Sequence, residues 1–168
     1  MDALTGAQEQ EAVRLMDAAF AGDFDETDWA HALGGTHAVA FGDGRMVGHA
    51  SVVPRDLWAD DTHLASGYVE AVAVLPELQG LGIGSELMRS LEAVLDGTEL
   101  GVLGTDSHRF YERLGWERWR GTTWVRTESA LVRTADEDDG IMIRRTALTP
   151  DFAPDARLIC LPREGDDW

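Results

Sequence analysis

The chain has 168 residues, 44% of them hydrophobic, and its 31 acidic and 14 basic residues give a formal net charge of −17. This length and composition predict a single domain, residues 1–168, with its own hydrophobic core. The negative charge argues against nucleic-acid binding and favours a cationic partner or substrate, although solubility or a halophilic background would also account for it. All 14 basic residues are Arg, which excludes Schiff-base and nucleophilic chemistry on Lys.

The sequence favours a cytoplasmic protein without a membrane partner. No apolar run approaches the ~20 residues that span a bilayer. The N-terminal segment lacks the basic and apolar regions of a signal peptide. The single Cys160 cannot form an intramolecular disulfide, which fits a reducing compartment.

Two helices are expected at the start of the chain. Apolar residues at helical spacing predict the first over residues 7–20. The second covers residues 25–33, where Asp25 is placed to cap the helix and Asp28 occupies position N3.

Four strands are expected next, over residues 36–41, 46–53, 56–65 and 67–75. Gly42-Asp43-Gly44 joins the first two as a hairpin, and Pro54 is expected to close the second. The third is the weakest of the four, and the fourth is the most apolar.

The second half of the chain predicts alternating helices and strands. A helix is expected over residues 83–96, because Leu87, Leu91 and Leu95 recur at intervals of four. The later elements are a helix at 106–114 and strands at 100–103, 116–119, 122–127 and 140–146, followed by a Pro- and Asp-rich tail at 149–168. This order predicts an α/β fold with a central mixed β-sheet flanked by helices.

The most informative segment runs from Tyr68 to Glu86, where an apolar strand leads through Gly80, Gly82 and Gly84 into a helix. Closely spaced glycines let the backbone approach a ligand, and the N–H groups of a helix N-terminus attract phosphate. The spacing does not match a P-loop or a dinucleotide-binding turn. The pattern therefore predicts a site for another phosphorylated cofactor, the alternative being an ordinary glycine-rich turn.

Two residues are candidates for proton transfer. Glu70 lies in the apolar strand, where its neighbours suggest burial on both faces, and a buried carboxyl group with a raised pKa suits a general base. The alternative is a Glu on a solvated face or one paired with Arg. Tyr111 could donate a proton through its phenol, or it could be an ordinary core aromatic residue.

Acidic residues gather in segments 23–28, 136–139 and 165–168. Helix capping accounts for Asp25 and partly for Asp28 but not for Asp23, whereas the other two segments could be a solvated loop and a frayed terminus. Together the three segments could form anionic walls for a polycation. No metal-binding motif is present, so we expect no metal site.

Two motifs resemble the GNAT N-acetyltransferase superfamily: Gln79-x-x-Gly82-x-Gly84 after a strand, and the segment from Phe110 to Trp116. A closer resemblance, over nearly the whole chain, is to the aminoglycoside 2′-N-acetyltransferases. It rests on AGDFDETDWAHALGG (21–35), GYVEAVAV (67–74), Asp-Asp-Gly at 138–140 and the terminal GDDW. Residues 101–107, which are shorter than the family pattern and lack its serine-rich run, and 149–163 match less well.

The resemblance implies a GNAT acyl-CoA N-acyltransferase fold and transfer of acetyl from acetyl-CoA to the 2′-amine of an aminoglycoside. Glu70 would be the general base, often acting through water, and Tyr111 the acid. Acetyl-CoA would bind Val72, Ala73, Val74, Gln79, Gly80, Leu81, Gly82, Ile83, Gly84 and Ser85. The aminoglycoside would contact Asp23, Asp28, Glu70, Ala71, Gly104, Asp138, Asp166 and Trp168, the last through a terminal carboxylate.

The family also implies a homodimer formed through strands near the C-terminus. Two other functions remain open at this point. One is acetylation of a different cationic amine, such as a polyamine or a peptide N-terminus. The other is a non-catalytic module that binds acyl-CoA or an aminoglycoside.

Overall fold

The computed structural model describes residues 3–168. They form two compact units, one comprising the residues up to Val53 together with Val69–Val94 and the other comprising Pro54–Tyr68 and Leu95–Trp168. None of the helices in residues 3–168 is both long and apolar enough to cross a membrane.

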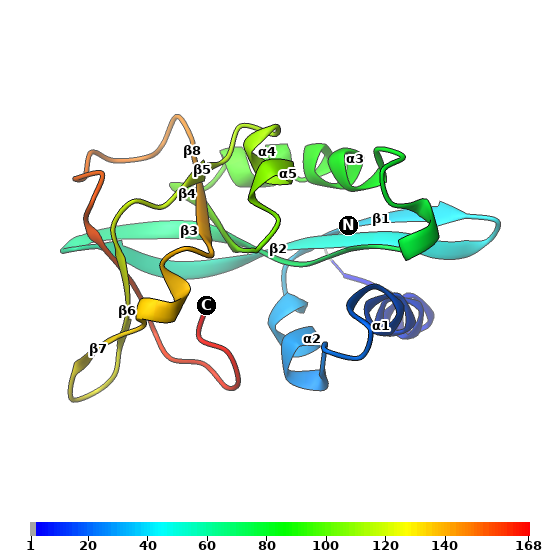
Figure 1. Cartoon of the computed structure of the whole chain (residues 1–168), viewed down its shortest axis with the longest axis horizontal. Coiled ribbons are helices and arrows are strands. Elements are labelled where there is room, and N and C mark those ends of the chain that lie inside the picture. The colour runs from blue at the N-terminus through cyan, green and yellow to red at the C-terminus, as the bar shows by residue number, and fades with distance from the viewer. Residues whose placement is uncertain (1–2) are drawn as a thin grey trace. The chain divides into compact units, whose positions relative to one another are not determined.

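The first unit contains three whole α-helices and three strand segments. The helices are α1 (Gly6–Phe20), α2 (Glu26–Ala32) and α3 (Ile83–Ser90), and the strands are β1 (Thr36–Gly42) and parts of β2 (Arg45–Ala59) and β3 (Thr62–Val74). Figure 1 shows α1 and α2 on one face of these strands and α3 on the other. The core beneath α1 and α2 includes Leu15, Met16, Trp29, Val47 and Ala73.

The ends of α1 and α2 confirm the helices predicted there. Thr5 caps α1 through a reciprocal pair of bonds with Gln8. Asp25 caps α2, because its carboxylate accepts the N–H groups of Thr27 and Asp28 at 2.7 and 3.0 Å. Asp28 returns a bond, since its Oδ2 accepts the N–H of Asp25 at 2.9 Å.

The predicted hairpin is also confirmed. Asp43 and Gly44 form its two-residue turn with φ of 50° and 77°, the left-handed pair that a type I′ turn requires. On β2, Gly48 allows α3 to pack closely, because an added Cβ would lie 2.9 Å from Leu87 Cδ1 and 3.0 Å from Ile83 Cγ2.

Two boundary predictions were wrong. Pro54 does not close a strand: β2 runs without interruption to Ala59, and β3 begins three residues later at Thr62. Pro54 lies between the residues of β2 that pair with β1 and those that pair with β9 (Arg157–Cys160), where its missing N–H costs neither ladder a bond.

The second wrong boundary prediction is the single helix over 83–96. This segment forms two helices, α3 and α4 (Glu92–Asp96), which are separated at Leu91. The N–H of Leu91 bonds to the Met88 carbonyl at 3.2 Å, three residues back, so the last turn of α3 is tightened there.

The second unit contains most of the mixed sheet. Its strands follow the order β5-β8-β4-β3-β2-β9-β6-β7, with β3–β4 and β6–β9 parallel and the other recorded pairs antiparallel. The strands not yet defined are β4 (Leu100–Gly104), β5 (Glu117–Arg118), β6 (Thr122–Arg126), β7 (Leu131–Arg133) and β8 (Ile141–Arg145). The helix α5 (His108–Glu112) is shorter than the segment 106–114 predicted for it.

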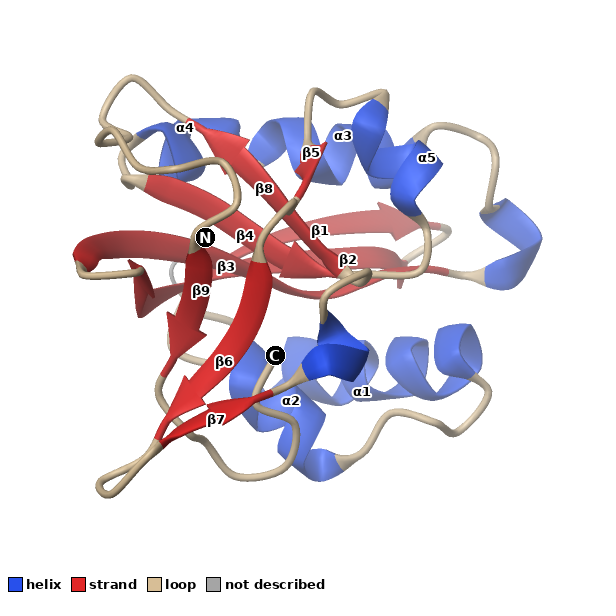
Figure 2. Ribbon diagram, turned by 60° about the vertical axis from the view of Figure 1, so that its left-hand side comes forward, coloured by secondary structure: helices blue, strands red, loops and turns tan. Residues whose placement is uncertain are grey.

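Strands β7 and β9 were not predicted. Figure 2 shows β9, β6 and β7 side by side, with the C-terminus close to β6. The four residues of β9 pair with β2 on one side and with β6 on the other, so they are held by partners distant in sequence. The tail therefore contributes one strand to the sheet.

Candidate active site

The glycine-rich segment predicted to bind a phosphorylated cofactor forms the entry to α3 in the first unit. Gly80 and Gly82 have φ of 78° and 91°, a region that other residues rarely adopt. A Cβ added at either glycine would meet nothing within 4 Å, so this face of the loop is open. The side chain of Gln79 folds back and donates from Nε2 to the Val74 carbonyl at 3.2 Å.

Helix α3 begins at Ile83 without a side-chain cap. In the first turn of this helix, the N–H of Glu86 donates to the carbonyl of Gly82 at 3.1 Å. The N–H groups of residues 83–85 precede that bond and lie at the positive end of the helix dipole. The loop can therefore receive an anionic group such as a pyrophosphate.

Glu70 lies on β3 in the first unit. From this residue the strand alternates: residues 70, 72 and 74 are half-buried, and residues 71 and 73 are buried. The expectation that Glu70 is buried on both faces was therefore wrong, because only one face of β3 is fully covered at this point. The side chain of Glu70 remains partly accessible for chemistry.

The backbone turns sharply at Ala71, where φ is 51° within the strand. The carbonyl groups at this turn are bound by side chains of β2: Ser51 Oγ donates to the Glu70 oxygen at 3.3 Å, and Nδ1 of His49 lies 2.8 Å from the Ala71 oxygen. The turn is thus held by side chains as well as by the sheet ladder.

The two acidic residues predicted to bind substrate in the first unit have different surroundings. Asp23 is exposed just before α2, and its N–H bonds to the Phe20 carbonyl at 3.1 Å. Asp28 is half-buried and uses Oδ2 in the helix cap. Capping and substrate binding are compatible for Asp28, because a carboxylate has more acceptor sites than the cap uses.

Tyr111 lies on α5 in the second unit, with a side chain only 6% exposed. Its ring makes edge contacts with Phe110 and Trp116, at centroid distances of 4.8 and 6.1 Å. Burial raises the pKa of Tyr111, so the phenol keeps its proton at neutral pH and can act as a donor. Core packing and proton donation are thus both compatible with its position.

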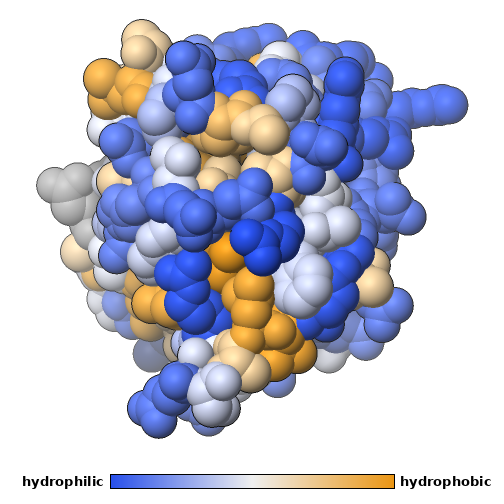
Figure 3. Space-filling model, turned by 90° about the vertical axis from the view of Figure 1, so that its left-hand side faces the viewer, coloured by the Kyte–Doolittle hydropathy of each residue, from blue (hydrophilic) through white to orange (hydrophobic). Residues whose placement is uncertain are grey.

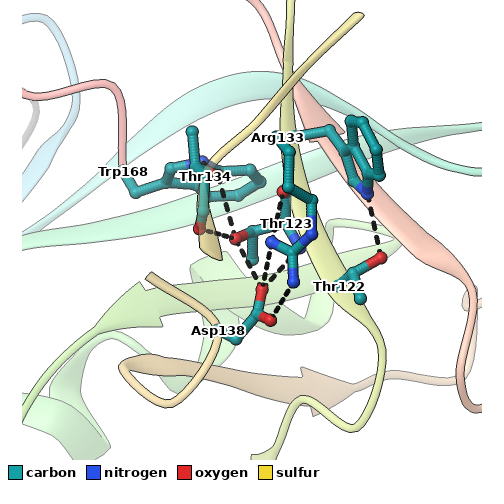
Figure 4. Close-up of polar contacts among 7 residues, drawn as sticks. Thr122, Thr123, Arg133, Thr134, Asp138 and Trp168 are labelled. Carbon is teal, nitrogen blue, oxygen red and sulfur yellow. Dashed lines mark hydrogen bonds and ion pairs between the residues drawn. The ribbon is translucent and has the colours of Figure 1, made fainter. Parts of the chain in front are cut away.

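Asp138 is the centre of a polar network in the second unit (Figure 4). Its Oδ1 accepts bonds from the N–H of Thr123 at 2.8 Å, from Thr123 Oγ1 at 2.9 Å and from Arg133 Nη1 at 2.8 Å. Its Oδ2 accepts a bond from Arg133 Nη2. Desolvation raises the pKa of Asp138, but these bonds outweigh it and hold the pKa below its usual value.

The same network reaches the end of the chain. The indole N–H of Trp168 donates to Thr134 Oγ1 at 3.1 Å, and Thr134 Oγ1 donates to Thr123 Oγ1 at 2.9 Å, as Figure 4 shows. The N–H of Trp168 donates to Asp166 Oδ1 at 3.1 Å. The alternative that residues 165–168 form a frayed terminus is therefore wrong, since Trp168 is only 6% exposed.

Two arginines hold this tail against the rest of the unit. The Arg55 guanidinium donates to the Asp167 carbonyl and lies 4.8 Å from the ring centroid of Tyr68. Arg163, within the tail, donates from Nε to the Asp166 carbonyl at 2.6 Å, and its guanidinium lies 5.5 Å from the ring centroid of Tyr68. Gly104, the last residue of β4, lies beside Tyr68, because an added Cβ would be 3.7 Å from the phenol oxygen.

Acidic side chains lie near one another in this unit. Burial raises the pKa of Glu137, and the negative charges of Asp166 and Asp136 raise it further. Much of the face shown in Figure 3 is hydrophilic, with hydrophobic strips between the polar groups. The local excess of negative charge favours a cation over an anion.

The predicted residues therefore fall into two sets. The first unit holds Asp23, Asp28, Glu70, Ala71 and the segments 72–74 and 79–85, and the second holds Gly104, Tyr111, Asp138, Asp166 and Trp168. Within the second, Asp138, Asp166 and Trp168 are joined by hydrogen bonds. No group of three or more potential metal ligands occurs among the residues that the structure describes.

Sequence reasoning missed the residues that support these sites. Arg133, Thr123 and Thr134 surround Asp138, but no local motif marks them. His37 and His49 could have been found from the predicted hairpin. Its register pairs His37 with Ser51 and Val39 with His49, which places both imidazoles on one face.

The strand, glycine loop and helix N-terminus define an α/β protein whose open loop could receive an anionic group. Residues 7–116 match the family model described as the Acetyltransferase (GNAT) family. The chain belongs to this family of acetyltransferases, which confirms the predicted fold class.

Three relatives illustrate the similarity. A protein named Aminoglycoside 2'-N-acetyltransferase, from Mycolicibacterium fortuitum, is 40% identical over 94% of this chain and 83% of its own length. The GNAT N-acetyltransferase YhbS from Escherichia coli, solved in complex with CoA, has a TM-score of 0.66 at 17% identity, covering 94% of this chain and 86% of that one.

A GCN5-related N-acetyltransferase from Kribbella flavida has a TM-score of 0.60 at 23% identity. The match covers 72% of this chain and 33% of that one, so the aligned part of this chain spans about a third of that larger protein.

Proposed function

We propose that this protein transfers the acetyl group of acetyl-CoA to the 2′-amine of aminoglycosides. The observation that carries the proposal is the 40% identity, over 94% of the chain, to a protein named for that activity. The net charge of −17 supports it independently, since aminoglycosides carry several ammonium groups.

Acetyl-CoA binds the first unit in this proposal. The open loop at Gly80 and Gly82 and the N–H groups of residues 83–85 receive the pyrophosphate. The backbone of Val72, Ala73 and Val74 holds the pantetheine arm in strand-like hydrogen bonds. The solved complex of YhbS, a protein of this fold, with CoA supports acetyl-CoA as the co-substrate.

The aminoglycoside binds acidic and backbone groups. Asp23, Asp28, Asp138 and Asp166 pair with ammonium or hydroxyl groups, and Ala71, Gly104 and Trp168 complete the set. Burial and then the negative charges of Asp166 and Asp136 raise the pKa of Glu137, and the part due to charge supports a cationic substrate, because a bound ammonium group would relieve it.

The reaction is a direct acyl transfer. Glu70 removes a proton from the ammonium group, through a water molecule, and the free amine attacks the thioester carbonyl carbon. Backbone N–H groups stabilise the oxyanion, the C–S bond then breaks, and Tyr111 donates its proton to the departing thiolate. The products are the N-acetylated aminoglycoside and free CoA.

Release of CoA thiol from acetyl-CoA tests this proposal across a panel of aminoglycosides with either an amine or a hydroxyl at the 2′ position. Turnover confined to 2′-amines supports both the reaction and its position. Turnover regardless of the 2′ group would support acetyltransferase activity but contradict acetylation at the 2′-amine. If no aminoglycoside causes release of CoA although the protein binds acetyl-CoA, the substrate is another cationic amine or the protein is a non-catalytic binding protein.

A cytoplasmic location, a homodimer and a role in antibiotic resistance complete the proposal. The buried, unpaired Cys160 is compatible with a reducing compartment. Light scattering tests the dimer. Expression in a susceptible host tests resistance, which should be selective for aminoglycosides with a 2′-amine.

A further inference from the structure

Two histidines are buried beneath the turn at Ala71. His37 on β1 is 3% exposed, and His49 on β2 is 0% exposed. Their ring centroids are 5.3 Å apart, and Trp29 of α2 lies 5.3 Å from the His49 centroid and 6.5 Å from that of His37. Buried polar rings of this kind need defined hydrogen-bond partners.

The carbonyl of Ala71 fixes the direction of the hydrogen bonds. A carbonyl oxygen can only accept, so Nδ1 of His49 carries the proton and donates to it at 2.8 Å. Burial lowers the pKa of both imidazoles, so both are neutral at neutral pH. Nε2 of His49 then accepts, and Nδ1 of His37, at 3.0 Å, is the donor.

The hydrogen bonds from His37 to His49 and from His49 to the Ala71 carbonyl end at a strained backbone position. Ala71 has φ of 51°, a left-handed conformation that is unfavourable for a residue with a Cβ, so its surroundings must stabilise the turn. His49 and Ser51 are two residues apart on one face of β2, and they bind the carbonyls of Ala71 and Glu70 respectively.

The same histidines contact the helix that carries a predicted substrate ligand. Trp29, whose ring is tilted at 57° to that of His49, directly follows Asp28 in α2. The contact therefore links the helix of Asp28 to the turn at Ala71 within the first unit.

We propose that His49, oriented by His37, is a positioning residue that holds the Glu70–Ala71 backbone in the conformation needed for acetyl transfer. The inference rests on the proposed function. His49 acts through the Ala71 carbonyl and exchanges no proton with the substrate.

Substitution of His49 tests the inference. Asn places an amide N–H close to the position of Nδ1, whereas Leu fills space without a donor. We expect His49→Leu to lower kcat by at least about 10-fold, with KM for acetyl-CoA changed by less than about 3-fold, and His49→Asn to recover most of kcat. His63→Leu, at an exposed histidine bonded to Asp56, is the matched control.

Long-range ¹H–¹⁵N spectra of the wild-type protein keep the inference testable if His49→Leu does not fold. They should show His49 and His37 both protonated at Nδ1 only. A His49 ring protonated at Nε2, a wild-type kcat in folded His49→Leu, or an equal loss in His49→Asn would overturn the inference.

The two proposals fail in different ways. A wild-type protein that binds acetyl-CoA but acetylates no aminoglycoside overturns the proposed function, while the imidazole spectra still decide the hydrogen bonds at Ala71. Activity in the wild type, unaltered in His49→Leu, overturns the positioning role alone.

Discussion

Both carboxylate oxygens of Asp138 accept hydrogen bonds from the guanidinium of Arg133, five residues earlier in the chain. A residue predicted to bind a substrate cation is therefore already paired with a cation of the protein. The bidentate contact fixes the orientation of the carboxylate. Thr123 adds two bonds to Oδ1, so Asp138 also organises the strands around it.

Asp138→Ala should lower the free energy of unfolding by about 2 kcal/mol, because it leaves the Thr123 N–H and Arg133 without their acceptor. Urea unfolding at pH 7 measures the change. Asp139→Ala, at the exposed neighbouring position, is the control and should be close to neutral. Equal effects of the two substitutions would show that the network contributes nothing to stability.

Gly82→Ala should weaken acetyl-CoA binding, because a Cβ would protrude into the open face of the loop and the backbone would strain at φ of 91°. The matched control is Gly22→Ala, which has φ of 88° and equally open surroundings but lies outside the loop. Each should cost about 1 kcal/mol of stability. Only Gly82→Ala should raise the Kd for acetyl-CoA in calorimetry, and equal Kd values would contradict the assignment.

Ala71→Gly should be tolerated, since glycine adopts the positive φ of this position without strain. Ala71→Val should be destabilising by at least about 2 kcal/mol, because a β-branched side chain is strained there and would crowd the buried core. Thermal unfolding compares the two variants. A Val variant as stable as the Gly variant would show that the turn relaxes readily.

The buried His49 should make stability depend on pH. Desolvation lowers its pKa to about 4, against the opposing bond to the Ala71 carbonyl. An unfolded His titrates near 6.5, so between these values the unfolded state binds more protons and stability rises with pH.

On acidification from pH 7 to pH 4, this group should remove up to about 3 kcal/mol of the free energy of unfolding. Denaturant titrations of wild type and His49→Asn across that range measure the difference, which should shrink as the pH falls. A constant difference would contradict the shift, because the change at other groups, such as the carboxyl of Glu137, is common to both proteins.

Glu70→Gln should lower kcat/KM for the aminoglycoside and flatten the low-pH limb of its profile, because the amide cannot accept the proton of the ammonium group. Measurement of kcat/KM from acidic to neutral pH, with Glu77→Gln as an exposed control, tests the role. An unchanged pH profile would exclude Glu70 as the base.

The features predicted correctly from sequence all have local signals. Helix α2 has its cap at Asp25, the first hairpin has its turn at Asp43-Gly44, and the loop before α3 has its glycines. In each case the residues that decide the conformation are neighbours in sequence, so a short window contains the whole interaction.

The features that were missed depend on distant partners. Strand β9 has four residues and is stable because it pairs with β2 and β6 on its two sides. Pro54 was expected to end a strand because proline has no N–H to donate to a neighbouring strand. Whether a strand tolerates proline depends on whether a neighbouring strand needs that N–H, and the sequence alone does not show the neighbours. The environment of Asp138 was unpredictable for the same reason, since Thr123 reaches it across 15 residues of chain.

The most direct test of the proposed function compares two substrates that differ only at the 2′ position, kanamycin B with an amine and kanamycin A with a hydroxyl. Each is incubated with the protein and acetyl-CoA, and the products are analysed by mass spectrometry and NMR. We expect one acetyl group on the 2′-nitrogen of kanamycin B and no product from kanamycin A. Acetylation of kanamycin A, or of another nitrogen in kanamycin B, would contradict it.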